Sequence, residues 1–423
     1  MKTDVLIVGC GVSGLYCALN LPCDKNVLVV TKSKVCESDS FLAQGGICVQ
    51  RDKDDFRPFY EDTLRAGHDE NNPESVKIMI SSSRETIDDL VGFGVEFERD
   101  GEDFDYTKEG AHSRARILFH KDETGKEITT KLLDAVKSRP NIKLVEDFTM
   151  VDLITQDNCC MGIIGKNADG EFVTVYADYT VLATGGIGGL YKHSTNYRHL
   201  TGDALAVSLE HGVKLQNIDY IQIHPTTLYT EEKGREFLIS ESVRGEGAIL
   251  LNSQGKRFVD ELLPRDVVAN AIFDEMKREG SAHVWLSLEK IPKEEILNHF
   301  PNIYHRCMQA GFDITAEPIP VVPSQHYFMG GIRVDTNSRT SMDRLYAVGE
   351  TACNGVHGKN RLASNSLLES LVFSKRAASD ISSSYTEIPH CEEITVDEDK
   401  YKNYQEEYKQ AVLDAIEKEK NHE

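Results

Sequence analysis

A short run of β-branched residues lies near the start of the chain and leads directly into a glycine-rich turn. Val5–Val8 is apolar, and after the turn Leu15–Leu21 has helical spacing that ends at Pro22. Val27–Val30 is a second β-branched run. The pattern predicts a strand, a tight turn, a helix and a second strand, with the two strands parallel.

Longer helical patterns follow at wider spacing. The spacing predicts helices over Ser75–Phe93, Thr124–Lys137 and about Ser366–Tyr385. The charged final stretch keeps a helical period in five apolar or aromatic positions: Tyr401, Tyr404, Tyr408, Val412 and Ile416.

Several short apolar runs predict further strands. One is expected at Lys143–Val145. Three more should form a small antiparallel sheet: Met150–Thr155, Met161–Lys166 and Phe172–Ala177. The segment 167–170 (Asn-Ala-Asp-Gly) has the composition of a hairpin turn between the last two. Tyr179–Ala183 and Arg344–Val348 predict separate buried strands, each followed by glycine.

These patterns predict an α/β protein in which a nucleotide-binding domain is interrupted by an insertion. The segment from 218 to about 330 is richer in proline, histidine and charge, and it lacks the alternation of strands and glycines. We therefore expect one domain from 1–217 and 333–385, an inserted domain at 218–332, and a charged helical tail at 386–423.

Composition excludes several classes of protein. The 423 residues carry 47 Lys and Arg against 69 Asp and Glu, a net charge of −22. This argues against a general nucleic-acid binder and a basic membrane-surface protein. No apolar run is long enough for a membrane helix, and the first run is too short for a signal peptide. The ten cysteines are scattered without zinc spacing, which favours free thiols in a reducing cytoplasm and no metal.

The glycine turn has the spacing of a dinucleotide-binding fingerprint. Gly9 permits a tight turn, Gly11 lets the backbone approach a pyrophosphate, and Gly14 lets the helix pack closely on the strand. The acidic residue expected about 20 positions later for a ribose hydroxyl is absent, because Thr31 and Lys32 stand there. This departure argues against NAD and leaves FAD open.

Two further strands end in glycine where ligands of open α/β sheets bind. Thr184 and Gly185 follow one of them, and Gly349 and Glu350 follow the other. Three such strand ends suit a long cofactor that crosses the sheet. Ordinary strand-to-turn junctions are the alternative explanation.

The inserted segment concentrates chemically active side chains. Arginine and histidine predominate over lysine, which suits a small dicarboxylate because arginine binds carboxylates bidentately and keeps its charge. The cluster between 222 and 266 comprises Gln222, His224, Ser240, Glu241, Arg244, Glu246, Arg265 and Asp266, and two further groups, His326 and Arg361, lie downstream.

Ten ordered motifs over about residues 3–380 resemble the succinate dehydrogenase/fumarate reductase flavoprotein family, and within it the L-aspartate oxidases. They begin with the fingerprint and Ala43-Gln44-Gly45-Gly46-Ile47. They continue with Ala183-Thr184-Gly185-Gly186, Thr201-Gly202-Asp203, His224-Pro225-Thr226, Arg244-Gly245-Glu246-Gly247, Pro264-Arg265-Asp266-Val267-Val268, His326-Tyr327, Gly349-Glu350 and Asn360-Arg361-Leu362-Ala363-Ser364-Asn365-Ser366-Leu367.

The resemblance implies a Rossmann-like FAD-binding domain, an α+β capping domain and a short helical tail. It also implies FAD bound non-covalently, because Asp39 and Ser40 stand where respiratory members carry the histidine that attaches the cofactor. The implied cofactor-binding residues are Gly9, Gly11, Ser13, Gly14, Thr31, Lys32, Ser40, Gln44, Gly45, Gly46, Thr184, Gly185, Asp203, Gly349, Glu350, Asn365, Ser366 and Leu367.

The implied reaction is oxidation of L-aspartate to iminoaspartate in NAD biosynthesis, with dioxygen or fumarate as acceptor. Glu109 lies in a segment similar to the one that contacts the substrate amino group in aspartate oxidases. The substrate residues implied with it are Gln222, His224, Ser240, His326 and Arg361. Arg265 is the proton-handling residue, with Glu241 and Arg244 as relay partners.

Two departures from the family are visible. Ser240 replaces a threonine, which retains a hydroxyl, and the tail is much shorter than the C-terminal helical domain of aspartate oxidases. A soluble fumarate reductase or succinate dehydrogenase flavoprotein is the nearest alternative, and a non-catalytic FAD-binding interaction protein is another. A transient contact with quinolinate synthase is a further expectation, with no nucleic-acid or membrane partner.

Overall fold

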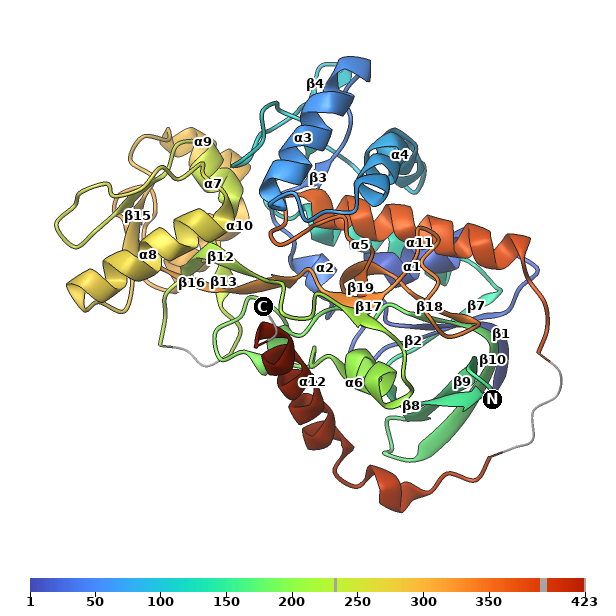
Figure 1. The fold of residues 1–423 in the computed structure, drawn as a ribbon. Helices are drawn as coiled ribbons and strands as arrows, with labels where there is room; N and C mark the ends of the chain where they lie inside the picture. The colour runs from blue at the N-terminus through green and yellow to red at the C-terminus, as the bar shows by residue number, and fades with distance from the viewer. Residues whose placement is uncertain (232–233, 389–393, 422–423) are drawn as a thin grey trace.

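The fold is described from a computed structural model of the chain. The structure describes residues 1–231, 234–388 and 394–421. Cys391 and parts of the inserted segment and the tail lie outside these ranges, and the cysteines described are all free thiols. The expected α/β architecture is confirmed (Figure 1).

The larger sheet is built around the first strand of the chain. Its strands are β1 (Lys2–Val8), β2 (Val27–Val30), β7 (Ile142–Val145), β8 (Thr149–Gln156), β9 (Cys159–Lys166), β10 (Phe172–Leu182) and β18 (Leu345–Ala347). They lie in the order β7-β2-β1-β10-β9-β8, and β18 pairs with the far end of β10. The strands β7, β2, β1, β10 and β18 run parallel, so their carboxyl ends share one edge.

Strand β10 corrects one expectation. The two strands predicted at 172–177 and 179–183 are a single strand, whose first half pairs with β9 antiparallel and whose second half pairs with β18 parallel. The polar residue between them, Asp178, is buried without breaking the strand. Its carboxylate accepts hydrogen bonds from the Tyr385 hydroxyl at 2.5 Å and the Ile388 amide at 2.9 Å, which satisfy it there. The predicted small sheet is therefore a continuation of the large one.

Helices cover both faces of this sheet. On one face Val5 and Ile7 pack against α1, α4, α5 and α11, and on the other Leu6 and Val8 pack in the core with α6 and α12. The helices are α1 (Val12–Asn20), α2 (Asp39–Leu42), α3 (Phe56–Ala66), α4 (Pro73–Gly92), α5 (Thr124–Lys137), α6 (Asp203–Glu210), α11 (Asn365–Ser383) and α12 (Tyr404–Lys420). The expected positions of the helices now labelled α4, α5 and α11 are confirmed to within two residues at each end.

A second sheet forms a separate lobe, on the left of Figure 1. Its order is β13-β12-β16-β15-β14, and all its paired strands are antiparallel. These strands are β12 (Ile221–Leu228), β13 (Phe237–Leu238), β14 (Ile249–Leu251), β15 (Val284–Ser287) and β16 (Ile319–Phe328). The lobe also contains α7 (Glu241–Gly245), α8 (Arg265–Glu279), α9 (Lys293–His299) and α10 (Pro301–Gln309). The domain boundaries drawn from the sequence remain a prediction.

Shorter strands pair around and between the lobes. They are β3 (Ile47–Cys48) with β6 (Ile117–Leu118), β4 (Arg99–Asp100) with β5 (Asp103–Phe104), and β17 (Gly331–Arg333) between β11 (Leu215–Gln216) and β19 (Ala352–Cys353). Short 3-10 turns occur at Lys53–Asp55, Gly188–Leu190, Gly349–Thr351 and Glu398–Tyr401.

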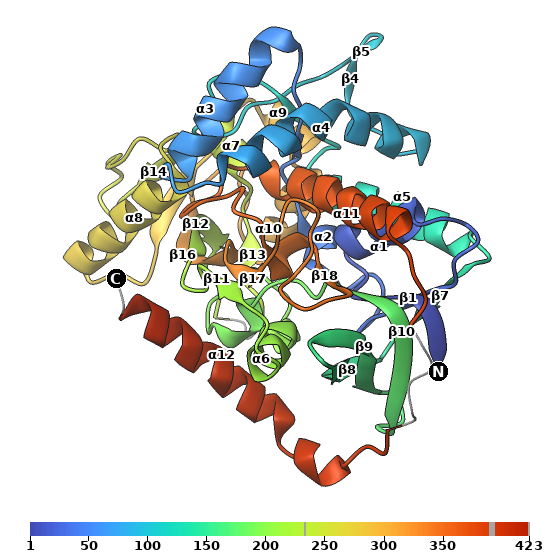
Figure 2. The same ribbon diagram turned by 45° about the vertical axis from the view of Figure 1, so that its right-hand side comes forward.

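The C-terminal segment packs along the large sheet beside α6 (Figure 2). The helical spacing expected for it is confirmed, since all five periodic apolar or aromatic positions are buried. Asp152 of β8 fixes its start by accepting hydrogen bonds from Tyr401 at 2.6 Å and Lys400 at 2.9 Å. Burial opposes ionisation of Asp152, yet hydrogen bonds from His211, Tyr401 and Lys400 hold the pKa of its carboxyl well below its usual range.

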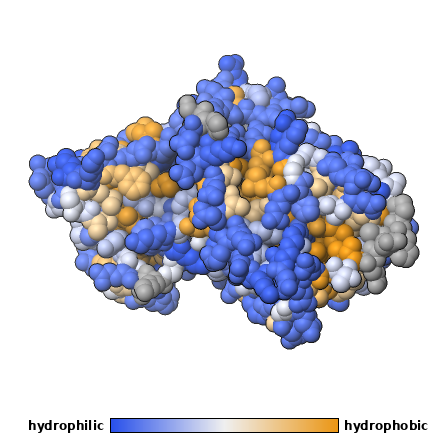
Figure 3. Space-filling model, turned by 60° about the horizontal axis from the view of Figure 1, so that its bottom comes forward, coloured by the Kyte–Doolittle hydropathy of each residue, from blue (hydrophilic) through white to orange (hydrophobic). Residues whose placement is uncertain are grey.

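The surface is largely hydrophilic. Figure 3 shows one face, on which polar side chains predominate and apolar side chains form scattered patches. Within the described ranges, every helix is too short or too polar to cross a lipid bilayer.

Candidate functional site

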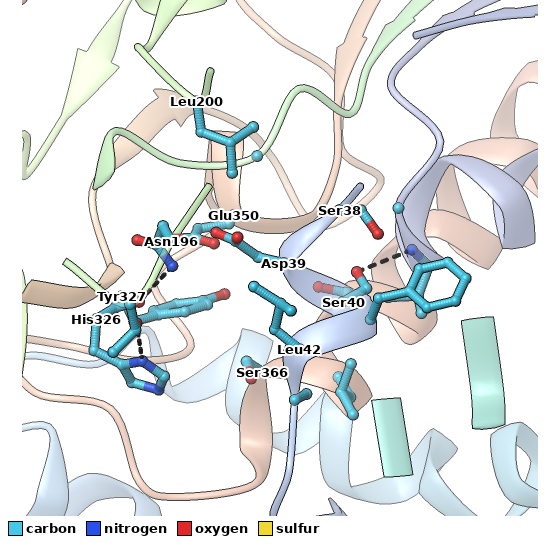
Figure 4. Close-up of a pocket in the computed structure, with 18 of the residues that line it drawn as sticks. Ser38, Asp39, Ser40, Leu42, Asn196, Leu200, His326, Tyr327, Glu350 and Ser366 are labelled. Carbon is cyan, nitrogen blue, oxygen red and sulfur yellow. Dashed lines mark hydrogen bonds between the residues drawn. The ribbon is translucent and has the colours of Figure 1, made fainter. Parts of the chain in front are cut away.

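A cavity of about 390 Å³ lies at the carboxyl edge of the large sheet and reaches the second lobe. Figure 4 shows side chains from distant parts of the chain converging on it. Fifteen of the cofactor residues expected from the sequence line it: Gly9, Gly11, Ser13, Thr31, Lys32, Ser40, Gln44, Gly45, Gly46, Thr184, Gly185, Asp203, Glu350, Ser366 and Leu367.

The glycine turn brings the backbone of β1 and α1 to the cavity wall. Gly9 has φ +115°, and a side chain on it would overlap the Ala183 carbonyl oxygen. A side chain on Gly14 would overlap the Gly9 carbonyl, which is the close packing of helix on strand that the fingerprint predicts. A Cβ on Gly11 would lie 3.1 Å from the Ser40 hydroxyl, inside the cradle. The turn can therefore admit a pyrophosphate.

Polar groups on the cavity wall suit the expected FAD. Within the described residues, the Ser38 hydroxyl, one Asp39 carboxylate oxygen and the Gln44 amide oxygen are buried without a hydrogen-bond partner. Asp39 and Glu350 both face the cavity (Figure 4), where burial raises the pKa of Asp39 to about 7 and that of Glu350 to about 8. Unpartnered polar atoms in a long groove fit a ligand with hydroxyl and phosphate groups.

Lys32 occupies the position where a dinucleotide fingerprint usually has an acid. Its ammonium lies 2.6 Å from an Asp203 carboxylate oxygen and 3.2 Å from the Thr201 hydroxyl. Asp203 begins α6, far along the chain. A carboxylate therefore does reach this end of the cavity, supplied by α6 and held there by Lys32.

Three expected cofactor residues do not line the cavity. Gly14 lies beneath the turn, and Gly349 (φ +68°) packs against the Ser13 side chain. The Asn365 amide instead donates to the Thr63 hydroxyl at 3.2 Å, away from the cavity. Their assignment to cofactor binding stays a prediction from the sequence.

Replacing Gly11 by valine should give a folded protein without bound FAD. The branched side chain would meet Ser40 and occupy the space next to the turn. The measurement is the ratio of the flavin absorbance band to protein absorbance, with circular dichroism to check folding. Gly92→Val, at a glycine with open space around it, is the matched control. Stoichiometric FAD in Gly11→Val would remove the turn from the cofactor site.

At the other end of the cavity, two arginines are held by one glutamine. The Gln222 amide oxygen accepts a hydrogen bond from Arg265 Nη1 at 2.9 Å and from Arg361 Nε at 3.2 Å. Arg265 begins α8, and Arg361 lies just before α11. Gln222 does not line the cavity itself, so it fixes the separation of the two guanidinium groups. Such a pair matches the two ends of a small dicarboxylate.

Arg265 also contacts a buried carboxylate. Its Nε donates to Glu241 Oε2 at 2.5 Å, and Arg244 Nη2 lies 3.5 Å from the same oxygen. Burial opposes ionisation of Glu241, but the two guanidinium groups hold its pKa below its ordinary value. Arg244 lies behind the cavity wall, where burial lowers its pKa. The three side chains form a continuous charged row that leads away from the cavity.

Two neutral histidines face the same space. Burial lowers the pKa of both His224 and His326 well below the ordinary value. His224 Nδ1 lies 3.1 Å from both the amide nitrogen and the carbonyl oxygen of Thr226, and the other ring nitrogen is Nε2. That nitrogen is buried and has no partner among the described residues. It is a ring nitrogen that a bound ligand can reach with a hydrogen bond.

Glu109 brings a negative charge to this end of the cavity. Its side chain is buried, and one oxygen lies so close to Gly45 that a Cβ there would have no room. The pKa of Glu109 is raised above its ordinary value by burial and the nearby Glu241, although Arg265 and two serine hydroxyls offset part of the rise. Ser240, another expected residue, lines the cavity as the N-cap of α7.

Sequence reasoning missed several wall residues, and two of them, Thr195 and Asn196, lie in a loop without a recognisable motif. The Thr195 hydroxyl lies 2.7 Å from His326 Nδ1. The Asn196 amide donates to the His326 carbonyl at 3.1 Å, and Figure 4 shows both of these residues at the cavity. Tyr327 stacks under Arg361, 4.7 Å from its ring centre to the guanidinium carbon. Only Tyr327 had a sequence cue, because it follows His326 in a quoted motif.

Comparison with known proteins identifies relatives over most of the chain. A family model described as FAD binding domain matches residues 4–367. L-aspartate oxidase of Clostridium perfringens is 53% identical over 381 residues, which cover 90% of this chain and 87% of the relative. L-aspartate oxidase of Clostridium acetobutylicum is 52% identical, covering 91% and 89%. Among solved structures, a mutant FrdA chain of E. coli quinol fumarate reductase is similar with a TM-score of 0.85 and 28% identity, covering 98% of this chain and 74% of that one.

Proposed function

The chain belongs to the L-aspartate oxidases, within the FAD-binding family of succinate dehydrogenase and fumarate reductase flavoproteins, and from that premise we propose that the described cavity is its active site. The enzyme uses FAD to oxidise L-aspartate to iminoaspartate, a step of NAD biosynthesis. Bound FAD supplies the two-electron acceptor for hydride from the substrate α-carbon.

One observation carries the assignment of the site: two arginines and one glutamate face the same end of the cavity. Aspartate has two carboxylates and one ammonium group. Arg361 offers a cation that binds a substrate carboxylate, Arg265 places a second positive charge beside it, and Glu109 offers the anion for the ammonium. A plain dicarboxylate has no group that pairs with Glu109, so this arrangement favours the amino acid.

The carboxylate-binding groups have separate parts in this proposal. Arg361 remains charged, since burial lowers its pKa only to about 10, and it binds one carboxylate. His224 and His326, both neutral, donate hydrogen bonds to the substrate without adding charge. Gln222 keeps Arg361 and Arg265 at a fixed separation. Ser240 adds a hydroxyl to the same wall.

Arg265 is the proposed proton-handling group. A guanidinium with its usual pKa above about 12 is a poor base, so a proton must pass along a relay. Glu241, whose carboxylate lies 2.5 Å from Arg265, and Arg244, 3.5 Å from the same carboxylate oxygen, form the proposed relay. The row of charges lets a proton leave the Arg265 guanidinium without creating an isolated buried charge.

An anaerobic titration tests the function. Adding L-aspartate to the yellow protein should bleach the flavin band, and succinate added instead should leave most of the colour. Bleaching by succinate alone would favour a succinate dehydrogenase activity. An unchanged spectrum with both would favour a non-catalytic FAD-binding protein.

We propose that FAD is held without a covalent bond. Asp39 and Ser40 supply no imidazole where respiratory relatives attach the cofactor. Acid precipitation should therefore leave a colourless pellet and a yellow supernatant. A yellow pellet after washing would show a covalent link.

Replacing Glu109 by glutamine should change the choice of substrate. Loss of the charge removes the partner of the aspartate ammonium and relieves repulsion toward fumarate. The kcat/KM for aspartate should fall, mainly through KM, while fumarate reduction by reduced enzyme persists or improves. The ratio of the two kcat/KM values should move at least about tenfold, equivalent to ~1.4 kcal/mol. A smaller change would remove Glu109 from substrate selection.

We also propose which molecules accept the electrons and where in the cell the enzyme works. The substrate is L-aspartate, and fumarate is an acceptor of nearly the same shape. We propose that dioxygen also serves, that the enzyme works in the cytoplasm, and that it makes a transient contact with quinolinate synthase, which consumes iminoaspartate. Coupled turnover in mixtures of the two enzymes, compared with separated compartments, tests the contact.

A further inference from the structure

Both oxygens of the Glu109 carboxylate are held by serine hydroxyls from distant parts of the chain. Ser242 Oγ donates to Glu109 Oε1 at 2.9 Å, and Ser364 Oγ donates to Oε2 at 2.5 Å. Ser242 is in α7, while Ser364 immediately precedes α11. All three side chains are buried. The carboxylate therefore accepts a hydrogen bond on each oxygen from a different element, which restricts its rotation.

The Ser242 hydroxyl is the hydrogen-bond donor to Glu109. A hydroxyl carries a single proton, and the proton of Ser242 is given to Glu109. The Ser242 oxygen accepts from the Ser240 hydroxyl at 3.1 Å, and the Ser242 amide donates back to Ser240 at 3.2 Å. These bonds make a short row from Ser240 through Ser242 to Glu109. The row fixes the Ser242 rotamer that Glu109 needs.

The turn that carries Ser364 is also braced. His112 Nε2 lies 3.0 Å from the Ala363 carbonyl oxygen, and its Nδ1 lies 3.0 Å from Arg116 Nη1. Arginine only donates, so Nδ1 accepts and Nε2–H donates to the carbonyl. Arg116 is itself fully buried between Asp55 and Asp62. The backbone beside Ser364 is therefore fixed by a separate buried network.

Serine suits this position because it orients a carboxylate without neutralising it. A lysine or arginine in its place would pair with Glu109 and compete with the substrate ammonium. Each carboxylate oxygen can accept about two hydrogen bonds, so the serines leave acceptor capacity on Glu109 for the substrate.

We propose that Ser242, together with Ser364, is a positioning residue that orients the Glu109 carboxylate toward the substrate amino group and thereby determines selection of an amino dicarboxylate. This inference rests on the proposed function. It makes substrate choice depend on a hydroxyl that does not touch the reacting atoms.

The test separates selection from general stability by using two substrates. Ser242→Ala should raise the KM for aspartate about tenfold, equivalent to ~1.4 kcal/mol, with kcat changed less than about threefold. The kcat/KM for fumarate reduction should change less than about twofold, because fumarate has no amino group. Ser242→Thr should restore the aspartate KM. Ser374→Ala is the matched control, because Ser374 is also buried but bonds the Ser370 carbonyl within α11.

A double-mutant cycle isolates the path through Glu109. In a Glu109→Gln background, Ser242→Ala should have no further effect on the aspartate KM. Ser364→Ala provides a second variant if Ser242→Ala does not fold. Equal losses for aspartate and fumarate, or an undiminished effect of Ser242→Ala in the Glu109→Gln protein, would overturn the inference. Failure of the wild-type protein to oxidise aspartate would instead overturn the proposed function.

Discussion

Replacing Arg265 by leucine is expected to lower kcat by about 10²–10⁴-fold for both aspartate oxidation and fumarate reduction. The guanidinium faces the cavity, and its bond to Glu241 begins the row along which a proton can leave. A leucine side chain has no ionisable group and cannot take part in proton transfer. Aspartate oxidation releases a proton from the amino group, and fumarate reduction adds a proton to the carbon that does not receive the hydride. Because the proposal gives both protons to Arg265, both reactions should fall together. Anaerobic flavin bleaching by aspartate and reoxidation by fumarate measure the two rates.

The variant leaves Glu241 buried with one of its cationic partners removed, which can cost about 3–5 kcal/mol of folding free energy. The double variant Arg265→Leu/Glu241→Gln removes that charge and keeps the test interpretable. Arg278→Leu, on the exposed last turn of the same helix, is the matched control and should leave kcat unchanged. A normal kcat in both Arg265 variants would exclude Arg265 from proton handling.

Replacing Arg361 by leucine should instead raise the aspartate KM. Loss of one partner of a buried charged hydrogen bond costs about 2–5 kcal/mol, and each ~1.4 kcal/mol is tenfold in affinity. The KM should thus rise roughly 30-fold to several thousand-fold, with a smaller change in kcat. Arg361→Lys keeps the charge but not the bidentate geometry, so its KM should be intermediate.

Arg361 also donates to the Ser366 hydroxyl at 2.7 Å, and Ser366 lines the cavity and is one of the expected cofactor residues. FAD content must therefore be measured alongside KM. Arg333→Leu, an exposed arginine on β17, serves as the control for the Arg→Leu change. An unchanged KM in a fully loaded Arg361→Leu protein would remove Arg361 from the substrate site.

Local pattern predicted most of the framework. The range predicted for α5 and the β-branched run of β2 match the structure residue for residue, because amphipathic and β-branched patterns record which face is buried. Strand β10 was divided in error because Asp178 is polar. Only its contacts with Tyr385 and Ile388, some 200 residues later, explain how it is tolerated within a strand.

Site residues that belong to a sequence motif were predictable. Residues that only the tertiary structure brings to the cavity were not. The spacing of Gly9 and Gly11 predicts the glycine turn, and Arg265 lies in one of the family motifs. Thr195 has no such cue, and it reaches His326 only through the loop geometry. Gln222 was expected among the substrate residues, whereas its side chain lies behind the wall between two arginines. Partners that lie over 100 residues apart leave no periodic trace in a sequence.

The order in which the cavity wall is synthesised bears on how the cofactor is acquired. The wall begins at Val8 and is completed only at Ser370. At ~5–20 residues per second on the ribosome, the last wall residue follows the first by roughly 20–70 s. A nascent chain therefore displays the phosphate turn long before α11 exists to close the groove. The complete groove is therefore available to FAD only after α11 has been synthesised, near the end of translation.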